Sequence, residues 1–220
     1  PGAVSDGVAA FAEPFRMRIL LPIDEPPDLL YRLITHELTH QFAFDIVPRS
    51  FLRQQPPLWG DEGLADYMAG VWNPLDLMAV RDAALSDSLP AMSEFVRGRQ
   101  FANPRLVYNL GHAAFEFIEE RWGKEGVRQF LFSLRKTVIG GGGDIYEDAF
   151  DMPAEDWDIA FERYIHDRFQ AFRDKERPDD YGRDLAPDPI ETRYLAVYSI
   201  EPSPSGDLIA AVALNRKDRE

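Results

Sequence analysis

The sequence HELTH at residues 36–40 constrains this chain more than any other segment, because it fits the H-E-x-x-H pattern. It lies within residues 28–45, where apolar residues recur at helical spacing, so the sequence predicts one helix there. Side chains four residues apart on a helix lie about 40° apart around its axis and about 6 Å along it. The imidazoles of His36 and His40 therefore face the same way and can ligate one metal ion, while Glu37 points aside.

This spacing is typical of a zinc hydrolase in which the glutamate between the two histidines is the general base. Zinc in such an enzyme usually takes three protein ligands and keeps a further position for water. The chain has no cysteine, so thiolate sites, cysteine nucleophiles and disulfides are excluded. The third ligand must therefore be one of the other two histidines or an acidic residue.

The composition limits the classes of partner that the chain is expected to bind. With 24 basic and 38 acidic residues the net charge is −14, which argues against nucleic acid, because phosphate binding needs a basic face. An anionic membrane surface is disfavoured for the same reason. No apolar run approaches the roughly 20 residues that span a bilayer. The chain begins at Pro1 without an initiator methionine, so we treat it as an N-terminally truncated fragment.

Hydrophobic periodicity and turn residues predict an α+β fold that is predominantly helical, with an N-terminal strand and a C-terminal β-hairpin. A Pro- and Asp-rich segment over residues 177–190 indicates a linker. The expected strands are residues 15–21, 194–200 and 208–214, and the expected helices are residues 28–45, 61–70, 74–86, 105–122, 124–137 and 153–174.

The segment from Trp59 to Tyr67 reads WGDEGLADY. H-E-x-x-H followed some twenty residues later by E-G-[LF]-A-x-Y resembles gluzincins of the aminopeptidase-N type, and most of all the peptidase MA-like group. The resemblance implies a zincin-like catalytic domain that hydrolyses peptide bonds with Zn²⁺. It makes Glu62 the third zinc ligand beside the two HELTH histidines, and Glu37 the general base. The metzincin pattern is excluded, since FAFDI follows His40 without its glycine and third histidine.

The same resemblance suggests two further roles. Asp66 follows Glu62 by four residues, where the thermolysin branch has an aspartate that supports a ligand histidine; the alternative is a solvated helix acid. Tyr108 begins a Y-x-x-G segment that matches the oxyanion-stabilising tyrosine of the aminopeptidase-N branch, and the alternative is a core aromatic. His112, one helical turn later, is the second candidate for that role.

Ala9, Ala10 and Phe11 precede the first expected strand. In related peptidases a strand edge beside the metal holds the substrate backbone in an extended form, and small residues would allow close approach. The resemblance therefore suggests these three residues for substrate binding, while a plain edge strand explains them equally well.

Residues 203–210, SPSGDLIA, resemble the S-P-[SD]-G-x-x-[IL]-A signature that opens a TolB-type β-propeller blade. We therefore expect a peptidase domain over residues 1–176 and the start of a propeller-like module over residues 191–220. Peptidase MA-like domains joined to such propellers occur in exported bacterial proteins. The resemblance thus implies a periplasmic or extracellular protein that acts on peptides or proteins and carries a C-terminal propeller at full length.

Two other functions stay open at this point. The chain could be a non-catalytic, metal-stabilised binding or scaffold module, although a purely structural site would not need Glu37. It could also be a metallohydrolase of non-peptide amides or esters, which the sequence does not separate from a peptidase.

Overall fold

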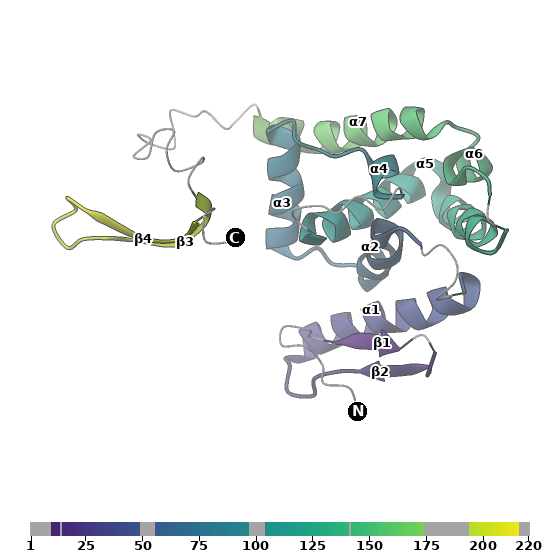
Figure 1. The fold of residues 1–220 in the computed structure, drawn as a ribbon, viewed down its shortest axis with the longest axis horizontal. Helices are drawn as coiled ribbons and strands as arrows, with labels where there is room; N and C mark the ends of the chain where they lie inside the picture. Colours follow the sequence, from purple (N-terminus) through teal and green to yellow (C-terminus); the bar gives the residue numbers. More distant parts are fainter. Residues whose placement is uncertain are drawn as a thin grey trace. The chain divides into compact units, whose positions relative to one another are not determined.

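The computed structural model describes residues 10–13, 15–48, 56–96, 104–140, 142–173 and 194–215 (Figure 1). The chain divides into two compact units, Pro1–Arg173 and Asp174–Glu220. The first unit contains β1 (Phe11–Glu13), β2 (Arg18–Leu20), α1 (Pro27–Ile46), α2 (Leu58–Ala69), α3 (Pro74–Leu85), α4 (Met92–Val96), α5 (Pro104–Gly140), α6 (Ile145–Phe150) and α7 (Ala154–Arg173). The second contains β3 (Tyr194–Pro202) and β4 (Ile209–Asn215).

The predicted α+β fold with mainly helical content is confirmed. The N-terminal strand is wrong in detail, because residues 15–17 form a turn rather than part of a strand. Met17 adopts a left-handed conformation, with φ of 49°, that reverses the chain between β1 and β2. The two strands then pair antiparallel, with Ala12 opposite Ile19.

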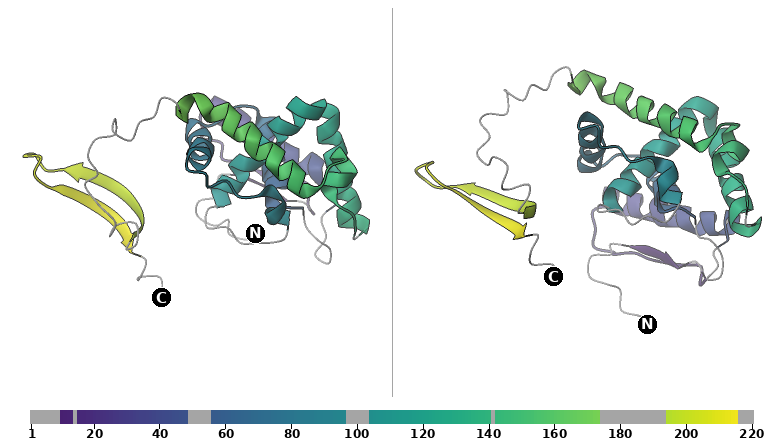
Figure 2. Two further views of the ribbon diagram at one scale, coloured as in Figure 1. Left: turned by 90° about the horizontal axis from the view of Figure 1, so that it is seen from above. Right: turned by 45° about the horizontal axis from the view of Figure 1, so that its top comes forward.

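Helix α1 begins at a proline, which suits the first helical position because it lacks the N–H that would otherwise be left unpaired there. The hairpin of β1 and β2 runs alongside α1 (Figure 1; Figure 2, right). Gln41 of α1 donates a hydrogen bond from its side-chain nitrogen to the backbone oxygen of Arg18 in β2, at 3.2 Å. The hairpin therefore adjoins the part of α1 that carries the HELTH segment.

Helix α2 lies between α1 and α5 (Figure 1). Its Trp59 is fully buried and packs against Phe130 of α5 and Trp157 of α7, with ring centroids 5.1 and 6.1 Å away. Helix α2 ends at Ala69 and is followed by Gly70, whose φ of 86° favours glycine. The aromatic core thus fixes the start of α2, three residues before Glu62.

Helices α2 and α5 cross in backbone contact. A Cβ atom added to Gly111 of α5 would lie 2.8 Å from the Cα of Gly63 in α2, closer than real Cβ contacts allow. Further along α5, Gly123 has a non-helical conformation with φ of 69°, so two helical halves meet there. This division agrees with the two helices predicted around that glycine.

The second unit is an antiparallel hairpin in which Pro202 pairs with Ile209. Its turn is closed by a hydrogen bond from the Ser203 N–H to the Leu208 oxygen, and Gly206 supplies a positive φ of 76°. The C-terminal hairpin was predicted. The propeller likeness of this unit stays a prediction.

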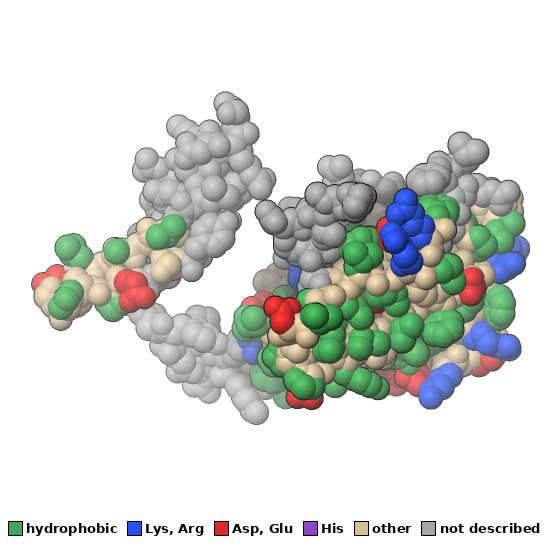
Figure 3. Space-filling model, turned by 90° about the horizontal axis from the view of Figure 1, so that it is seen from below, with side chains coloured by type: hydrophobic (Ala, Val, Ile, Leu, Met, Phe, Trp, Pro, Cys, Tyr) green, Lys and Arg blue, Asp and Glu red, His purple; other side chains and the backbone are tan. Residues whose placement is uncertain are grey.

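Hydrophobic side chains cover much of one face of the first unit (Figure 3). In this unit the hairpin, α1 and the segment between them expose large hydrophobic side chains: Phe15, Met17, Leu20, Ile23, Leu29, Tyr31, Leu38 and Phe42. Among the described helices, none is both long and apolar enough to cross a membrane.

Candidate metal centre

Helix α1 places the two HELTH histidines together, as the helical spacing predicts. The Nε2 atoms of His36 and His40 lie 3.2 Å apart, and their rings meet edge to face. His40 is buried and His36 is half-buried. Both imidazoles therefore present their Nε2 atoms to the same point.

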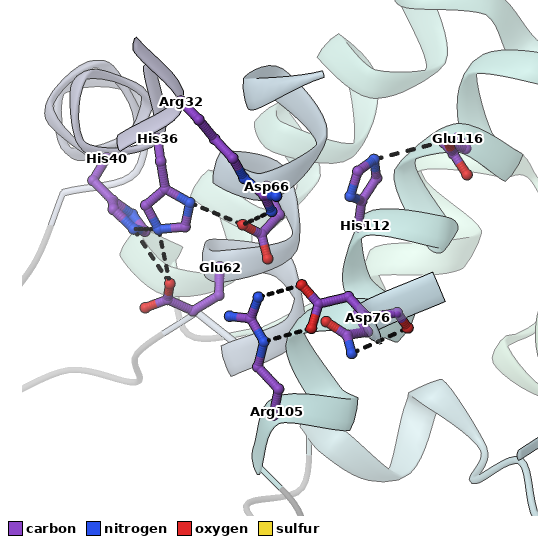
Figure 4. A network of polar contacts seen from close by, with 10 residues as sticks. Arg32, His36, His40, Glu62, Asp66, Asp76, Arg105, His112 and Glu116 are labelled. Carbon is purple, nitrogen blue, oxygen red and sulfur yellow. Dashed lines mark hydrogen bonds and ion pairs between the residues drawn. The ribbon is translucent and has the colours of Figure 1, made fainter. Parts of the chain in front are cut away.

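Helix α2 brings Glu62 to that point (Figure 4). Its Oε2 atom lies 3.4 Å from the Nε2 atom of His36 and 3.4 Å from that of His40. Among the described residues, these three form the group of side chains that could hold a metal ion, with ligand atoms within 4.8 Å of one another. Two helices separated in sequence thus supply one donor cluster.

The donor atoms fit a tetrahedral ion. Bonds of about 2.0–2.1 Å at tetrahedral angles separate neighbouring ligand atoms by about 3.3 Å. The separations between the three donors are 3.2, 3.4 and 3.4 Å. Two imidazoles and one carboxylate also suit several divalent ions, among them zinc. The spacing of the three donor atoms is therefore compatible with a bound metal ion.

The outer nitrogen of His36 is held by Asp66. The Nδ1 atom lies 3.1 Å from Oδ1 of Asp66, and an Nη2 atom of Arg32 lies 3.5 Å from the same oxygen (Figure 4). A carboxylate at this nitrogen keeps the proton there and leaves Nε2 free for a metal. Asp66 is 4% exposed, so it is not the solvated helix acid of the alternative interpretation.

A second carboxylate, Asp61, stands at the outer nitrogen of His40, with Oδ1 3.5 Å from Nδ1. Asp61 was not among the predicted site residues. The available signal was its position next to Glu62 and five residues before Asp66 in one helix. Helix α2 therefore carries the third donor together with a carboxylate for each imidazole.

The electrostatics of the cluster follow from these contacts. Burial lowers the pKa of His36, but hydrogen bonds to Asp66 and Glu62 outweigh it and raise the pKa to about 9. Burial likewise opposes protonation of His40, and Asp61 and Glu62 raise its pKa to about 10. Burial favours the neutral form of Glu62, but hydrogen bonds from the two imidazoles lower its pKa to about 2. Without metal, the carboxylates therefore favour the protonated form of both imidazoles.

Glu37 is 5% exposed and does not belong to the donor cluster. Burial raises its pKa, while the nearby imidazoles and a hydrogen bond from the backbone N–H of Ala12 in β1 lower it. Of the residues suggested for substrate binding, Phe11 begins the same strand and Ala10 directly precedes it, and both are half-buried. Ala9 lies outside the described residues.

Tyr108 is half-buried in the first part of α5. Burial and then the charge of Glu62 raise the pKa of its hydroxyl to about 12. The guanidinium carbon of Arg105 lies 5.9 Å from the centre of its ring. Among the three donors, the charge of Glu62 thus acts on the Tyr108 hydroxyl.

The other two histidines lie elsewhere. His112 is buried and stacks on Trp72 with ring centroids 4.0 Å apart, and burial lowers its pKa to about 4. It points toward Glu116, away from the donor cluster (Figure 4). His166 is on α7, where its Nε2 atom lies 3.7 Å from Glu162. Neither residue supplies a third ligand.

Searches against protein-family models, curated proteins and solved structures find no significant match to this chain. What the centre does must therefore be inferred from its own residues. The three expected ligands, His36, His40 and Glu62, come together, and Asp66 contacts one of them.

Proposed function

We propose that this protein is a zinc-dependent hydrolase of peptide bonds, in which His36, His40 and Glu62 hold the ion. The observation that carries this proposal is the convergence of three donor atoms at tetrahedral spacing beside a buried carboxylate that is not a ligand. A purely structural site needs no such carboxylate. When bound, zinc supplies Lewis-acid chemistry, lowering the pKa of a coordinated water and polarising a carbonyl group.

Glu37 is the proposed general base and later the general acid. A base works best when its pKa approaches the working pH. Burial moves the pKa of Glu37 upward in that direction, and the imidazoles of His36 and His40 limit the shift. Glu37 would take a proton from the attacking water and deliver it to the leaving amine.

Tyr108 is the proposed donor to the oxyanion that develops during attack. A donor must keep its proton at neutral pH, and burial with the charge of Glu62 raises the pKa of this hydroxyl to about 12. A pre-positioned neutral donor stabilises the developing charge without reorganisation.

The edge of β1 is the proposed contact for the substrate backbone. The N–H of Ala12 points to the Glu37 carboxylate, so this strand edge faces the general base. An extended peptide beside Ala10 and Phe11 could add to the edge by main-chain hydrogen bonds.

Two substitutions test the proposal. Glu37→Gln keeps the size of the side chain and removes the base, so we expect unchanged zinc content and turnover lower by about 100- to 10,000-fold. His40→Ala removes a ligand and should release the ion. Zinc is measured by elemental analysis and turnover with casein and a panel of fluorogenic peptides. Exposed Glu155 on α7 provides the matched control, Glu155→Gln, which should change neither quantity.

The outcomes separate the alternatives. Stoichiometric zinc without cleavage of any peptide, amide or ester would support a binding module. Cleavage of esters or non-peptide amides alone would support a different hydrolase. Retained turnover in Glu37→Gln would refute the proposed mechanism.

A further inference from the structure

Arg105 is a cation at the border of the centre whose role the proposed mechanism does not use. It lies one helical turn before Tyr108 in α5, and its side chain is 53% exposed. Its guanidinium carbon lies 5.9 Å from the centre of the Tyr108 ring, and its charge adds to that of His36 in lowering the pKa of Asp66.

Asp76 of α3 holds the guanidinium in place. The Nε atom of Arg105 donates to Oδ1 of Asp76 at 2.9 Å, and an Nη2 atom donates to Oδ2. Asp76 itself is buried, and its backbone oxygen accepts a hydrogen bond from Asn109 at 3.4 Å. A side chain gripped at two points loses little further conformational freedom when it binds another group.

The two hydrogen bonds to Asp76 leave other N–H donors of the Arg105 guanidinium available. A guanidinium carries five N–H groups, and the two bonds to Asp76 use two of them. Within the described part of the chain, Arg105 makes no other hydrogen bond to a side chain. Its third nitrogen points away from Asp76, toward the side on which Glu62 lies (Figure 4).

We propose that Arg105 determines specificity by binding a carboxylate of the substrate near the scissile bond, either an acidic side chain or a free C-terminus. This inference rests on the proposed function, because it assigns a substrate class to the same centre. A fixed arginine recognises a carboxylate through paired, charge-assisted hydrogen bonds.

The surroundings allow such a ligand. With zinc bound and neutral imidazoles, the charges of the ion, Arg32 and Arg105 total +4. The carboxylates of Glu37, Asp61, Glu62, Asp66 and Asp76 total −5, so the surroundings sum to −1. A substrate carboxylate would therefore be held by its direct contact with Arg105, not by the field of the whole centre.

Binding of small probes tests this inference without turnover. The probes are the monohydroxamic acids of succinic, glutaric and adipic acid, in which the hydroxamate binds zinc and the free carboxylate can reach Arg105. Each is compared with its carboxamide counterpart by calorimetry on the zinc-loaded protein. For at least one chain length, we expect the acid to bind about tenfold or more tightly than the amide.

In Arg105→Gln the acid and the amide should bind equally. The control Arg128→Gln, at an exposed residue of the same helix, should keep the preference. If Arg105→Gln fails to retain zinc, Arg105→Lys is used instead. Lysine keeps the positive charge but lacks the paired N–H donors of the guanidinium. The preference of Arg105→Lys for the acid over the amide should be at least threefold smaller than that of the wild type. A preference that persists in these variants, or none in the wild type, would overturn the inference.

The two proposals fail differently. If the protein takes up zinc but no hydroxamate binds, the ion has no open position, so the proposed hydrolase is wrong and the inference falls with it. If acids and amides bind equally, the centre stands and Arg105 has no such role. If the acids bind more tightly, competition by short peptides identifies the source of the carboxylate: a free C-terminus is compared with its amide, and an internal Glu with Gln.

Discussion

Gly63 of α2 and Gly111 of α5 face each other at the crossing of their helices, with no room for a Cβ atom on either. Gly63 follows the ligand Glu62, and Gly111 lies three residues after Tyr108. The crossing therefore fixes how close the expected oxyanion donor can come to the donor cluster. It also gives a packing reason for both glycines of the two sequence motifs.

We expect Gly63→Ala and Gly111→Ala each to destabilise the protein by about 1–3 kcal/mol, because the added methyl group pushes two backbones apart. Both should also weaken zinc binding. Thermal unfolding and zinc titration provide the measurements. Gly140→Ala is the matched control, since a Cβ atom there meets nothing within 4 Å and alanine favours a helix. Equal melting temperatures for all three variants would contradict the packing argument.

Zinc binding should release protons and strengthen as the pH rises. The raised pKa values of His36 and His40, about 9 and about 10, mean that the metal-free pair holds protons at pH 7. A metal binds only the neutral imidazole, so protons compete with it. We expect release of at least one proton per ion at pH 7, and affinity that increases up to about pH 10, the pKa of His40. Calorimetry in buffers of different ionisation enthalpy measures the release, and identical enthalpies in all buffers would rule it out.

The carboxylates behind the imidazoles should tune metal affinity. Asp66→Asn and Asp61→Asn keep the shape of each side chain but remove its charge, so each should weaken zinc binding by about 10- to 100-fold. The loss should be larger for Asp66, whose oxygen lies closer to its imidazole nitrogen. Competition with a fluorescent chelator measures the affinities. Asp156→Asn, at an exposed position of α7, serves as the control. If Asp66→Asn and Asp61→Asn bind zinc as tightly as this control, the two carboxylates do not support the imidazoles.

Tyr108→Phe should separate catalysis from metal binding. Loss of one oxyanion donor lowers the turnover number by about 100- to 1,000-fold. Zinc content should stay unchanged, because Tyr108 is not in the donor cluster. The readout is the turnover number on the best peptide of the panel, compared with Tyr31→Phe at an exposed position of α1. If Tyr108→Phe keeps the wild-type turnover number, the tyrosine contributes to packing and does not stabilise the oxyanion.

Much of the site could be predicted because its information is local. Four-residue spacing on one helix suffices to align His36 with His40, and a sequence motif identifies Glu62. The contact of Asp61 with His40 could not be predicted in this way, because it depends on how α1 and α2 pack. The roles of Glu37 and Tyr108 in catalysis stay predictions.

The secondary structure shows the same difference between what the local sequence predicts and what it does not. Long periodic segments such as α1 and α7 could be located from apolar spacing. The short helices α4 and α6 were missed, since five or six residues carry too little periodicity. The turn at Met17 was also missed, because a left-handed methionine has no sequence signal.

The division of the donors between two helices has a mechanical consequence. Helix α1 supplies two imidazoles and, through Gln41, is bonded to the N-terminal hairpin, whereas the third donor belongs to α2, which Trp59 anchors in the aromatic core. An ion in the centre would thus be a cross-link that fastens the N-terminal segment to the rest of the unit. Chelation would loosen that segment first and leave the aromatic core of α2, α5 and α7 assembled.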